Sequence, residues 1–190
     1  LTMANMIPSQ IFSNYLSSSS RVMIETSKLS AEFELTFSAI RDCISSGGAI
    51  FVAGNGGSSC EAVHFVEELV GRYKKDRPGI RAFHLQDSAT ITCWANDYDF
   101  SGIFERQVQA LMKPDDLLVV LSTSGNSDNI NKALVAAKQQ GNKTVAFLGK
   151  GGGKSSALAD ISLVVPSDET SHVQEVHLAF IHMICELLEA

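Results

Sequence analysis

The chain has 190 residues, of which 45% are hydrophobic and 19% are charged. This composition is typical of a globular protein with a packed core and excludes a mainly disordered chain. Acidic residues (21) outnumber basic residues (15), which gives a net charge of −6 and argues against sequence-independent binding of nucleic acid. The longest aliphatic run, Leu117 to Leu121, is far too short to span a membrane.

The length favours a single domain over residues 1–190, with N-terminal helices over about 1–46 and an α/β core over 47–190. The four cysteines show no Cys-x-x-Cys spacing, and the first residues do not show the pattern of a secretion signal. We therefore expect a cytoplasmic protein whose thiols are reduced.

The N-terminal segment is predicted to be helical. Its apolar residues recur with the spacing of one helical face: Leu29, Phe33, Phe37, Ile40 and Ile44. The Ser-Ser-Gly-Gly stretch at 45–48 is expected to end this helix. The serine run at 17–20 is expected to mark an earlier break.

From residue 49 onward, predicted strands alternate with predicted helices. The strands are expected at 49–53, 81–85, 115–121, 143–148 and 161–165. The helices are expected at 59–73, 101–112, 128–140 and 170–189. This alternation predicts an α/β fold with a five-stranded parallel sheet that is flanked by helices on both faces.

Two polar turns follow the first and third predicted strands. The first turn is Gly54-Asn55-Gly56-Gly57-Ser58-Ser59, and the second is Ser122-Thr123-Ser124-Gly125-Asn126-Ser127. Each precedes a helix, and a helix N-terminus at the carboxyl edge of a parallel sheet offers free N–H groups to an anion. Together the two turns indicate a small phosphorylated ligand that is rich in hydroxyl groups.

Neither turn is a nucleotide-binding motif. The first has Ser59 where Gly-x-Gly-x-x-Gly requires its last glycine. The glycine-rich stretch 149–155 fails as a P-loop because Leu148 stands at the position of the leading glycine. We expect a flexible loop there.

His64 and Glu68 stand four residues apart in the predicted helix after the first turn, so they share one face. Such a pair can bind a metal or act together as a carboxylate and an imidazole on one substrate. Glu67 is expected to face solvent. The closing helix adds Gln174, Glu175, His177, His182 and Glu186. Their spacing does not choose between His177 and His182, while His84 is expected to be a structural residue of a strand.

Several segments together resemble the phosphoheptose isomerases, a family with the sugar isomerase (SIS) fold. They are the first turn, His64 to Leu69, Gly71-Arg72-Tyr73, Asn96-Asp97, the second turn and Gln174 to His177. The resemblance implies a flavodoxin-like sheet and a homotetramer. It also implies conversion of sedoheptulose 7-phosphate to D-glycero-D-manno-heptose 7-phosphate through an enediol, a step that supplies lipopolysaccharide heptose.

The resemblance also implies roles for particular residues. Glu68 and His182 match the catalytic carboxylate and histidine, and His64, Glu68, Gln174 and His182 match zinc ligands. Substrate-binding positions are matched by Asn55, Gly56, Gly57, Ser58, Glu68, Arg72, Asn96, Asp97, Ser122, Thr123, Ser124, Ser127 and Gln174.

Two conflicts and two alternatives accompany this interpretation. A zinc-bound Glu68 is a weaker base, and Gln174 lies about 12 Å of helical rise from His182. One alternative is a non-catalytic SIS scaffold that resembles the initiator-associating protein that binds DnaA, although those relatives lack the Glu and His set. The other is a different kind of SIS protein: an enzyme that acts on hexose or pentose phosphates, or a sugar-phosphate sensor of the kind fused to DNA-binding domains, although no basic helix-turn-helix is visible.

Overall fold

The computed structural model describes residues 7–190. Five parallel strands form one sheet in the order β2-β1-β3-β4-β5. The strands are β1 Ile50–Gly54, β2 Ala82–His84, β3 Leu117–Ser122, β4 Lys143–Leu148 and β5 Ile161–Val164. This order is that of flavodoxin-like sheets, so the expected fold class is confirmed.

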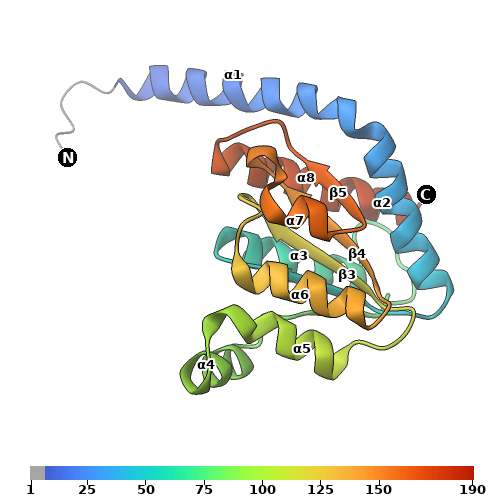
Figure 1. The fold of residues 1–190 in the computed structure, drawn as a ribbon. Coiled ribbons are helices and arrows are strands. Elements are labelled where there is room, and N and C mark those ends of the chain that lie inside the picture. Colours follow the sequence, from blue (N-terminus) through green and yellow to red (C-terminus); the bar gives the residue numbers. More distant parts are fainter. Residues whose placement is uncertain (1–6) are drawn as a thin grey trace.

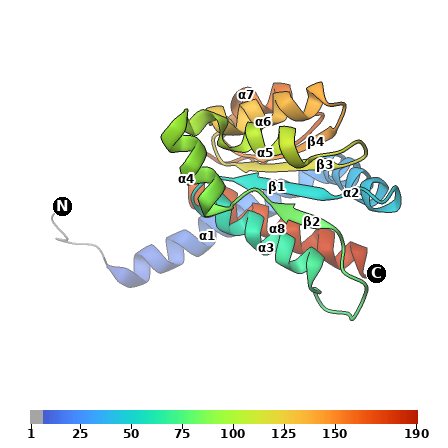
Figure 2. The ribbon, with the colours of Figure 1, turned by 90° about the horizontal axis from the view of Figure 1, so that it is seen from below.

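Helices cover both faces of the sheet (Figures 1 and 2). The α-helices are α1 Pro8–Thr26, α2 Ser30–Ser45, α3 Gly57–Val70, α4 Ser88–Asp97, α5 Ile103–Leu111, α6 Asp128–Gln139, α7 Gly153–Leu158 and α8 Thr170–Leu188. Short 3₁₀ turns, Ser27–Leu29, Phe100–Gly102 and Lys150–Gly152, precede α2, α5 and α7. Helices α2, α3 and α8 pack on one face, and α5 and α6 pack on the other.

The alternation of side chains along β3 explains the two cores. Val119 and Leu121 belong to the core under α3 and α8, whereas Leu118 and Val120 belong to the core under α5 and α6. Every residue of β3 is buried, because both faces of a parallel sheet are covered. The strands of the centre therefore read as continuous apolar runs.

Three local expectations were wrong. The serine run 17–20 lies inside the continuous helix α1, where Ser18 Oγ donates to the backbone oxygen of Tyr15 and so satisfies its hydroxyl within the helix. The stretch 149–155 is a 3₁₀ turn that leads into α7, not an open loop. Helix α4, whose N-terminus is capped by Asp87 Oδ1 accepting from Thr90 N (2.7 Å), was not anticipated.

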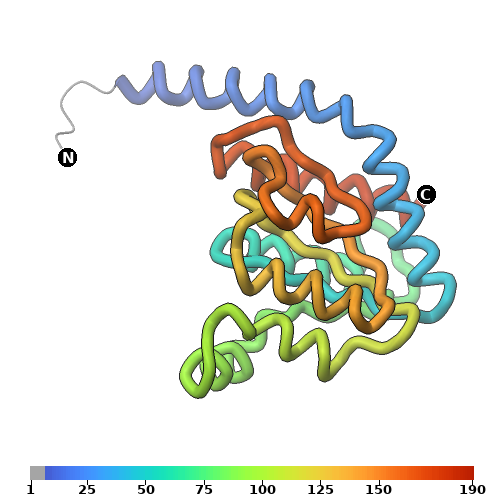
Figure 3. Tube along the Cα trace, viewed as in Figure 1, coloured from blue at the N-terminus to red at the C-terminus, as the bar shows by residue number. Residues whose placement is uncertain are grey.

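Helix α1 extends along one side of the molecule before the chain bends into α2 (Figure 3). Several of its large apolar side chains are exposed, including Phe12 at 67% and Ile24 at 72%. Among residues 7–190, no helix combines the length and the apolar character that crossing a membrane requires.

Candidate active site

The two polar turns lie side by side because β1 and β3 are neighbours whose carboxyl ends coincide, with Gly54 opposite Leu121. Asn55 and Asn129 join the turns: each amide Nδ2 donates to the other residue's Oδ1 at 2.9 Å. Asn129 lies at the start of α6 and is buried. The sequence interpretation assigned Asn55 to substrate and missed Asn129, which fixes the spacing between the turns.

The second turn is supported by the glycine-rich segment that leads into α7. The carbonyl oxygen of Gly125 accepts hydrogen bonds from Ser155 N (2.8 Å) and Ser155 Oγ (3.0 Å). Gly125 has a φ of +61°, and a Cβ added there would lie 1.9 Å from the carbonyl oxygen of Gly152. The glycine at 125 is therefore required both by backbone conformation and by close packing.

Gly125→Ala is expected to lower the free energy of unfolding by more than the roughly 1–2 kcal/mol that a left-handed conformation costs an L-residue. Gly141 is the matched control, because its φ is +82° and nothing lies within 4 Å of an added Cβ. Urea unfolding of both variants measures the difference. Equal losses in the two variants would show that the second turn does not need its close contact with Gly152.

His64 and Glu68 of α3 meet His182 of α8 in a compact group, here called the His–Glu cluster. Their ligand atoms all lie within 4.8 Å of one another. His64 Nε2 is 3.1 Å from His182 Nε2 and 3.5 Å from Glu68 Oε1. All three residues are half-buried, so the cluster is reachable while partly shielded from water.

The donor set fits zinc. Two imidazoles and one carboxylate are a usual ligand set for catalytic zinc, with the fourth position left for water or substrate. Ligands at about 2.0–2.1 Å in a tetrahedron are separated by roughly 3.3 Å. The observed separations of 3.1 and 3.5 Å bracket that value. Glu67 is 64% exposed, as expected, and its carboxylate also lies 3.6 Å from His64 Nδ1, where it can orient the ring.

The structure distinguishes His177 from His182, which the sequence alone could not do. His177 is fully buried, and its Nε2 lies 3.3 Å from the backbone oxygen of Leu148. Burial, only partly offset by this hydrogen bond, lowers the pKa of His177 to about 4, so it is a neutral core residue. His84 ends β2, on a strand as expected; it is exposed, and its Nδ1 accepts a hydrogen bond from the backbone N of Gln86 (3.3 Å).

Gln174 lies in the first turns of α8 and packs against the first turn of α3. A Cβ added to Gly57 would lie 2.4 Å from Gln174 Nε2, so the absence of a side chain at 57 makes room for it. Gln174 is thus beside the first polar turn. The about 12 Å of rise along α8 keeps Gln174 and His182 of one chain from binding the same ion.

The other predicted site residues divide into three groups. Ser58 and Ser122 are buried, and Thr123, Ser124 and Ser127 are half-buried. Asn96 and Asp97 are exposed at the end of α4, where Asn96 Nδ2 donates to Asp97 Oδ1 (2.8 Å). Arg72 lies in the loop after α3 rather than on the helix, and its Nη1 donates to the backbone oxygen of Lys74 (3.2 Å).

Two residues near the cluster were missed by the sequence interpretation. The ring of Tyr73 stacks on that of His182, with centroids 5.8 Å apart and planes at 25°. Glu61 stands seven residues before Glu68 on α3, so the two share a face. Burial, opposed only by a hydrogen bond from Ser58, raises the pKa of Glu61 to about 8. The seven-residue spacing was the signal that could have identified Glu61.

Glu61→Gln is expected to stabilise the protein increasingly as the pH rises from about 4.5 to about 8. The pKa of this carboxyl group is raised by folding. Its contribution to the free energy of unfolding is therefore complete below the unfolded pKa of 4.5 and is lost as the pH approaches 8. The neutral amide of the variant does not suffer this loss. Urea unfolding of the wild type and variant at pH 5 and 8 measures it, with the exposed Glu34→Gln as control. A pH-independent difference would contradict the buried state of Glu61.

Comparison with known proteins identifies the relatives of this chain. A family described as the SIS domain matches residues 14–149. A phosphoheptose isomerase from Trichlorobacter lovleyi is 48% identical over 144 residues, which cover 75% of this chain and 74% of that protein. A phosphoheptose isomerase from Vibrio cholerae is 44% identical over 160 residues, or 84% of each chain.

Solved structures agree with the sequence relatives. The structure of a phosphoheptose isomerase from Francisella tularensis superposes with a TM-score of 0.92 at 36% identity, covering 96% of this chain and 98% of that one. The phosphoheptose isomerase from Neisseria gonorrhoeae gives a TM-score of 0.91 at 32% identity, covering 96% and 99%.

Proposed function

The chain belongs to the phosphoheptose isomerases of the SIS domain family, and from this premise we propose which residues carry out each part of the reaction. The enzyme converts sedoheptulose 7-phosphate into D-glycero-D-manno-heptose 7-phosphate. One observation carries the proposal. Glu68 lies on α3, the helix that begins at the first turn, and His182 lies on α8, yet their ligand atoms are within 4.8 Å of each other.

We propose that the two turns bind the sugar phosphate. The hydroxyls of Ser122, Thr123, Ser124 and Ser127 and the free N–H groups at the start of α6 offer donors to the phosphate oxygens. The side chain of Ser127 does not cap α6, so its hydroxyl is available to a ligand. The first turn (Asn55, Gly56, Gly57 and Ser58) and Gln174 face the sugar hydroxyls, and Arg72, Asn96 and Asp97 complete the proposed contacts.

Glu68 is the proposed base. Its carboxylate removes a proton from C1 of the ketose, and the electron pair moves to form the C1–C2 double bond of an enediol. The same carboxylate returns the proton to C2. His182 donates a proton to the carbonyl oxygen at C2, and it takes the proton from the C1 hydroxyl as the new aldehyde forms.

His64, Glu68 and His182 are the proposed zinc ligands of one chain. A divalent ion held by these residues would supply Lewis-acid polarisation of the substrate oxygens. Glu68 has two carboxylate oxygens, so one can hold the ion while the other takes the proton. Gln174, a ligand by resemblance, can reach such an ion only from a second subunit.

A homotetramer is the proposed assembly. The exposed apolar side chains Ile11, Phe12, Leu16 and Ile24 of α1 are the support, because an apolar surface of this kind is typical of a subunit interface. Light scattering is expected to give four times the mass of the chain.

We propose the cytoplasm as the compartment, because all four cysteines are free thiols. The product is expected to enter heptose synthesis for lipopolysaccharide.

Incubation with sedoheptulose 7-phosphate tests the proposal, with fructose 6-phosphate and ribulose 5-phosphate as competing substrates. The heptose is expected to be converted with the highest kcat/KM. Preference for a shorter sugar would contradict the assignment of substrate. Retention of DnaA together with no turnover would support the scaffold, which the family relationship does not favour.

A further inference from the structure

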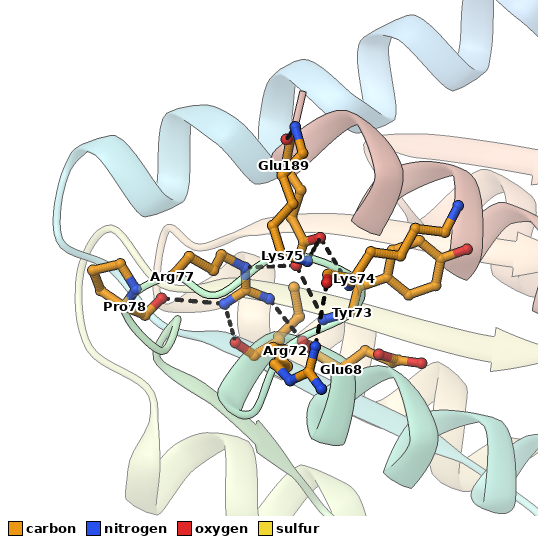
Figure 4. A network of polar contacts seen from close by, with 9 residues as sticks. Glu68, Arg72, Tyr73, Lys74, Lys75, Arg77, Pro78 and Glu189 are labelled. Carbon is orange, nitrogen blue, oxygen red and sulfur yellow. Dashed lines mark hydrogen bonds and ion pairs between the residues drawn. The ribbon is translucent and has the colours of Figure 1, made fainter.

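The segment after α3 is held by a single carboxylate at the end of α8 (Figure 4). Glu189 Oε1 accepts from the backbone N of Tyr73 (3.0 Å), and Oε2 accepts from the backbone N of Lys74 (2.9 Å) and of Lys75 (2.7 Å). Three consecutive N–H groups that converge on one anion form a backbone nest. The Glu189 side chain is only 3% exposed, so the carboxylate itself is largely shielded from water.

Arg77 attaches the same segment to α3. Its Nε lies 3.2 Å from Glu189 Oε1, and its Nη2 and Nη1 donate to the backbone oxygens of Glu68 (2.7 Å) and Leu69 (2.9 Å). The last turn of α3, which ends in free carbonyl groups, is thereby satisfied by a guanidinium. The Arg77–Glu189 ion pair therefore links three parts of the chain: the end of α8, the end of α3, and the segment that follows α3.

The charge state of Glu189 suits this role. Burial alone raises the pKa of a carboxyl group, but the three backbone donors and the Arg77 guanidinium outweigh it and lower the pKa of Glu189 to about 2. The carboxylate is therefore ionised throughout the pH range in which an isomerase of this kind works.

Glu189 holds the part of the loop after α3 that contacts the His–Glu cluster. Tyr73, whose N–H it accepts, stacks on His182, and Arg72 immediately precedes it. An aromatic ring stacked on an imidazole restricts the rotation of that imidazole. The orientation of His182 thus depends on a group that does not touch it.

We propose that Glu189 is a positioning residue of the isomerase, which fixes Tyr73 and Arg72 so that the Tyr73 ring holds His182 in its productive orientation. This inference rests on the proposed function of His182. It adds a residue, seven positions after His182 and directly after the end of α8, that the sequence motifs did not indicate.

The test compares Glu189→Gln with Glu186→Gln. Glu186 is the matched control, because it is on the same helix, loses the same charge and pairs only with the exposed Lys74 side chain in this network. Two readouts are measured on the full chain: the NMR signals of the His182 ring, and kcat and KM for sedoheptulose 7-phosphate. The NMR readout does not depend on turnover, so failure of the proposed function and failure of this inference are distinguished.

Glu189→Gln is expected to shift the His182 ring signals, because the ring current of Tyr73 is lost. It is also expected to lower kcat about 10-fold with little change in KM. A loss of this size lies within the 10- to 100-fold range of residues that orient a ligand. Glu186→Gln is expected to leave both readouts unchanged. Tyr73→Leu is expected to give the same loss, and the double variant Glu189→Gln/Tyr73→Leu no further loss, because both act through one contact.

If Glu189→Gln does not fold, Glu189→Asp keeps the charge on a side chain one methylene shorter and is expected to shift the same signals in the same direction. A lower melting temperature with unchanged His182 signals and unchanged kcat would overturn the proposal and leave Glu189 as a purely structural clasp. Fully additive losses in the double variant would also overturn it.

Discussion

Replacement of Glu68 by glutamine is expected to reduce kcat for sedoheptulose 7-phosphate by about 10²- to 10⁴-fold, the usual contribution of a positioned acid–base group. The amide has the size of the carboxylate but cannot accept the C1 proton. KM is expected to change less than kcat, because the two turns proposed to bind the sugar phosphate are left intact. Initial rates of aldose formation over a range of substrate concentrations separate the two parameters.

Glu67→Gln is the control for this experiment. Glu67 is adjacent in the chain and carries the same charge, but its side chain is 64% exposed and points toward His64 Nδ1 rather than into the cluster. Because Glu67 can orient His64 only from outside the cluster, Glu67→Gln is expected to lower kcat less than Glu68→Gln does. Near-full turnover in Glu68→Gln would show that another group removes the proton.

The second large effect is expected at the metal. His182→Asn removes one of the three proposed zinc ligands, so we expect zinc affinity to fall by more than the roughly 10- to 100-fold that loss of a group supporting a ligand costs. Zinc at 100 times its Kd should stabilise the wild type by about 2.7 kcal/mol, whereas the variant should gain far less. Titration against a chromophoric chelator and thermal unfolding with and without zinc measure these changes.

His84→Asn is the control, because His84 is exposed and outside the cluster. It should keep both the affinity and the stabilisation by zinc. Equal zinc affinity in His182→Asn and the wild type would mean that the His–Glu cluster is not the metal site.

The sheet was predictable because its signals are local. Each strand of the centre is a short apolar run between polar turns, and both cores follow from the alternation of residues such as Leu118 and Val119. Helix α4 was harder to see, because it has only 10 residues and its apolar residues Ile91, Trp94 and Ala95 are only partly buried against the core. The serine run misled for a related reason: Ser18 and its neighbours are poor helix formers that tertiary contacts hold in α1.

The candidate site was predictable only where its residues belong to one local sequence motif. The spacing of His64 and Glu68 is set by their own helix, but the choice of His182 over His177 depends on which face of α8 meets α3, and that is a tertiary fact. Residues that hold other segments in place were not visible at all. Asn129 and Glu189 hold the two turns and the Tyr73 loop by contacts between segments far apart in the chain.

The His–Glu cluster, with a bound metal, is the proposed site at which a heptose phosphate is isomerised. The most direct measurement is aldose formation from sedoheptulose 7-phosphate by the purified protein, before and after treatment with a chelator, and again after addition of zinc. We expect turnover that is lost on chelation and restored by zinc. Turnover unaffected by the chelator would contradict the metal site, and a folded protein that forms no aldose would contradict the isomerase function of the cluster.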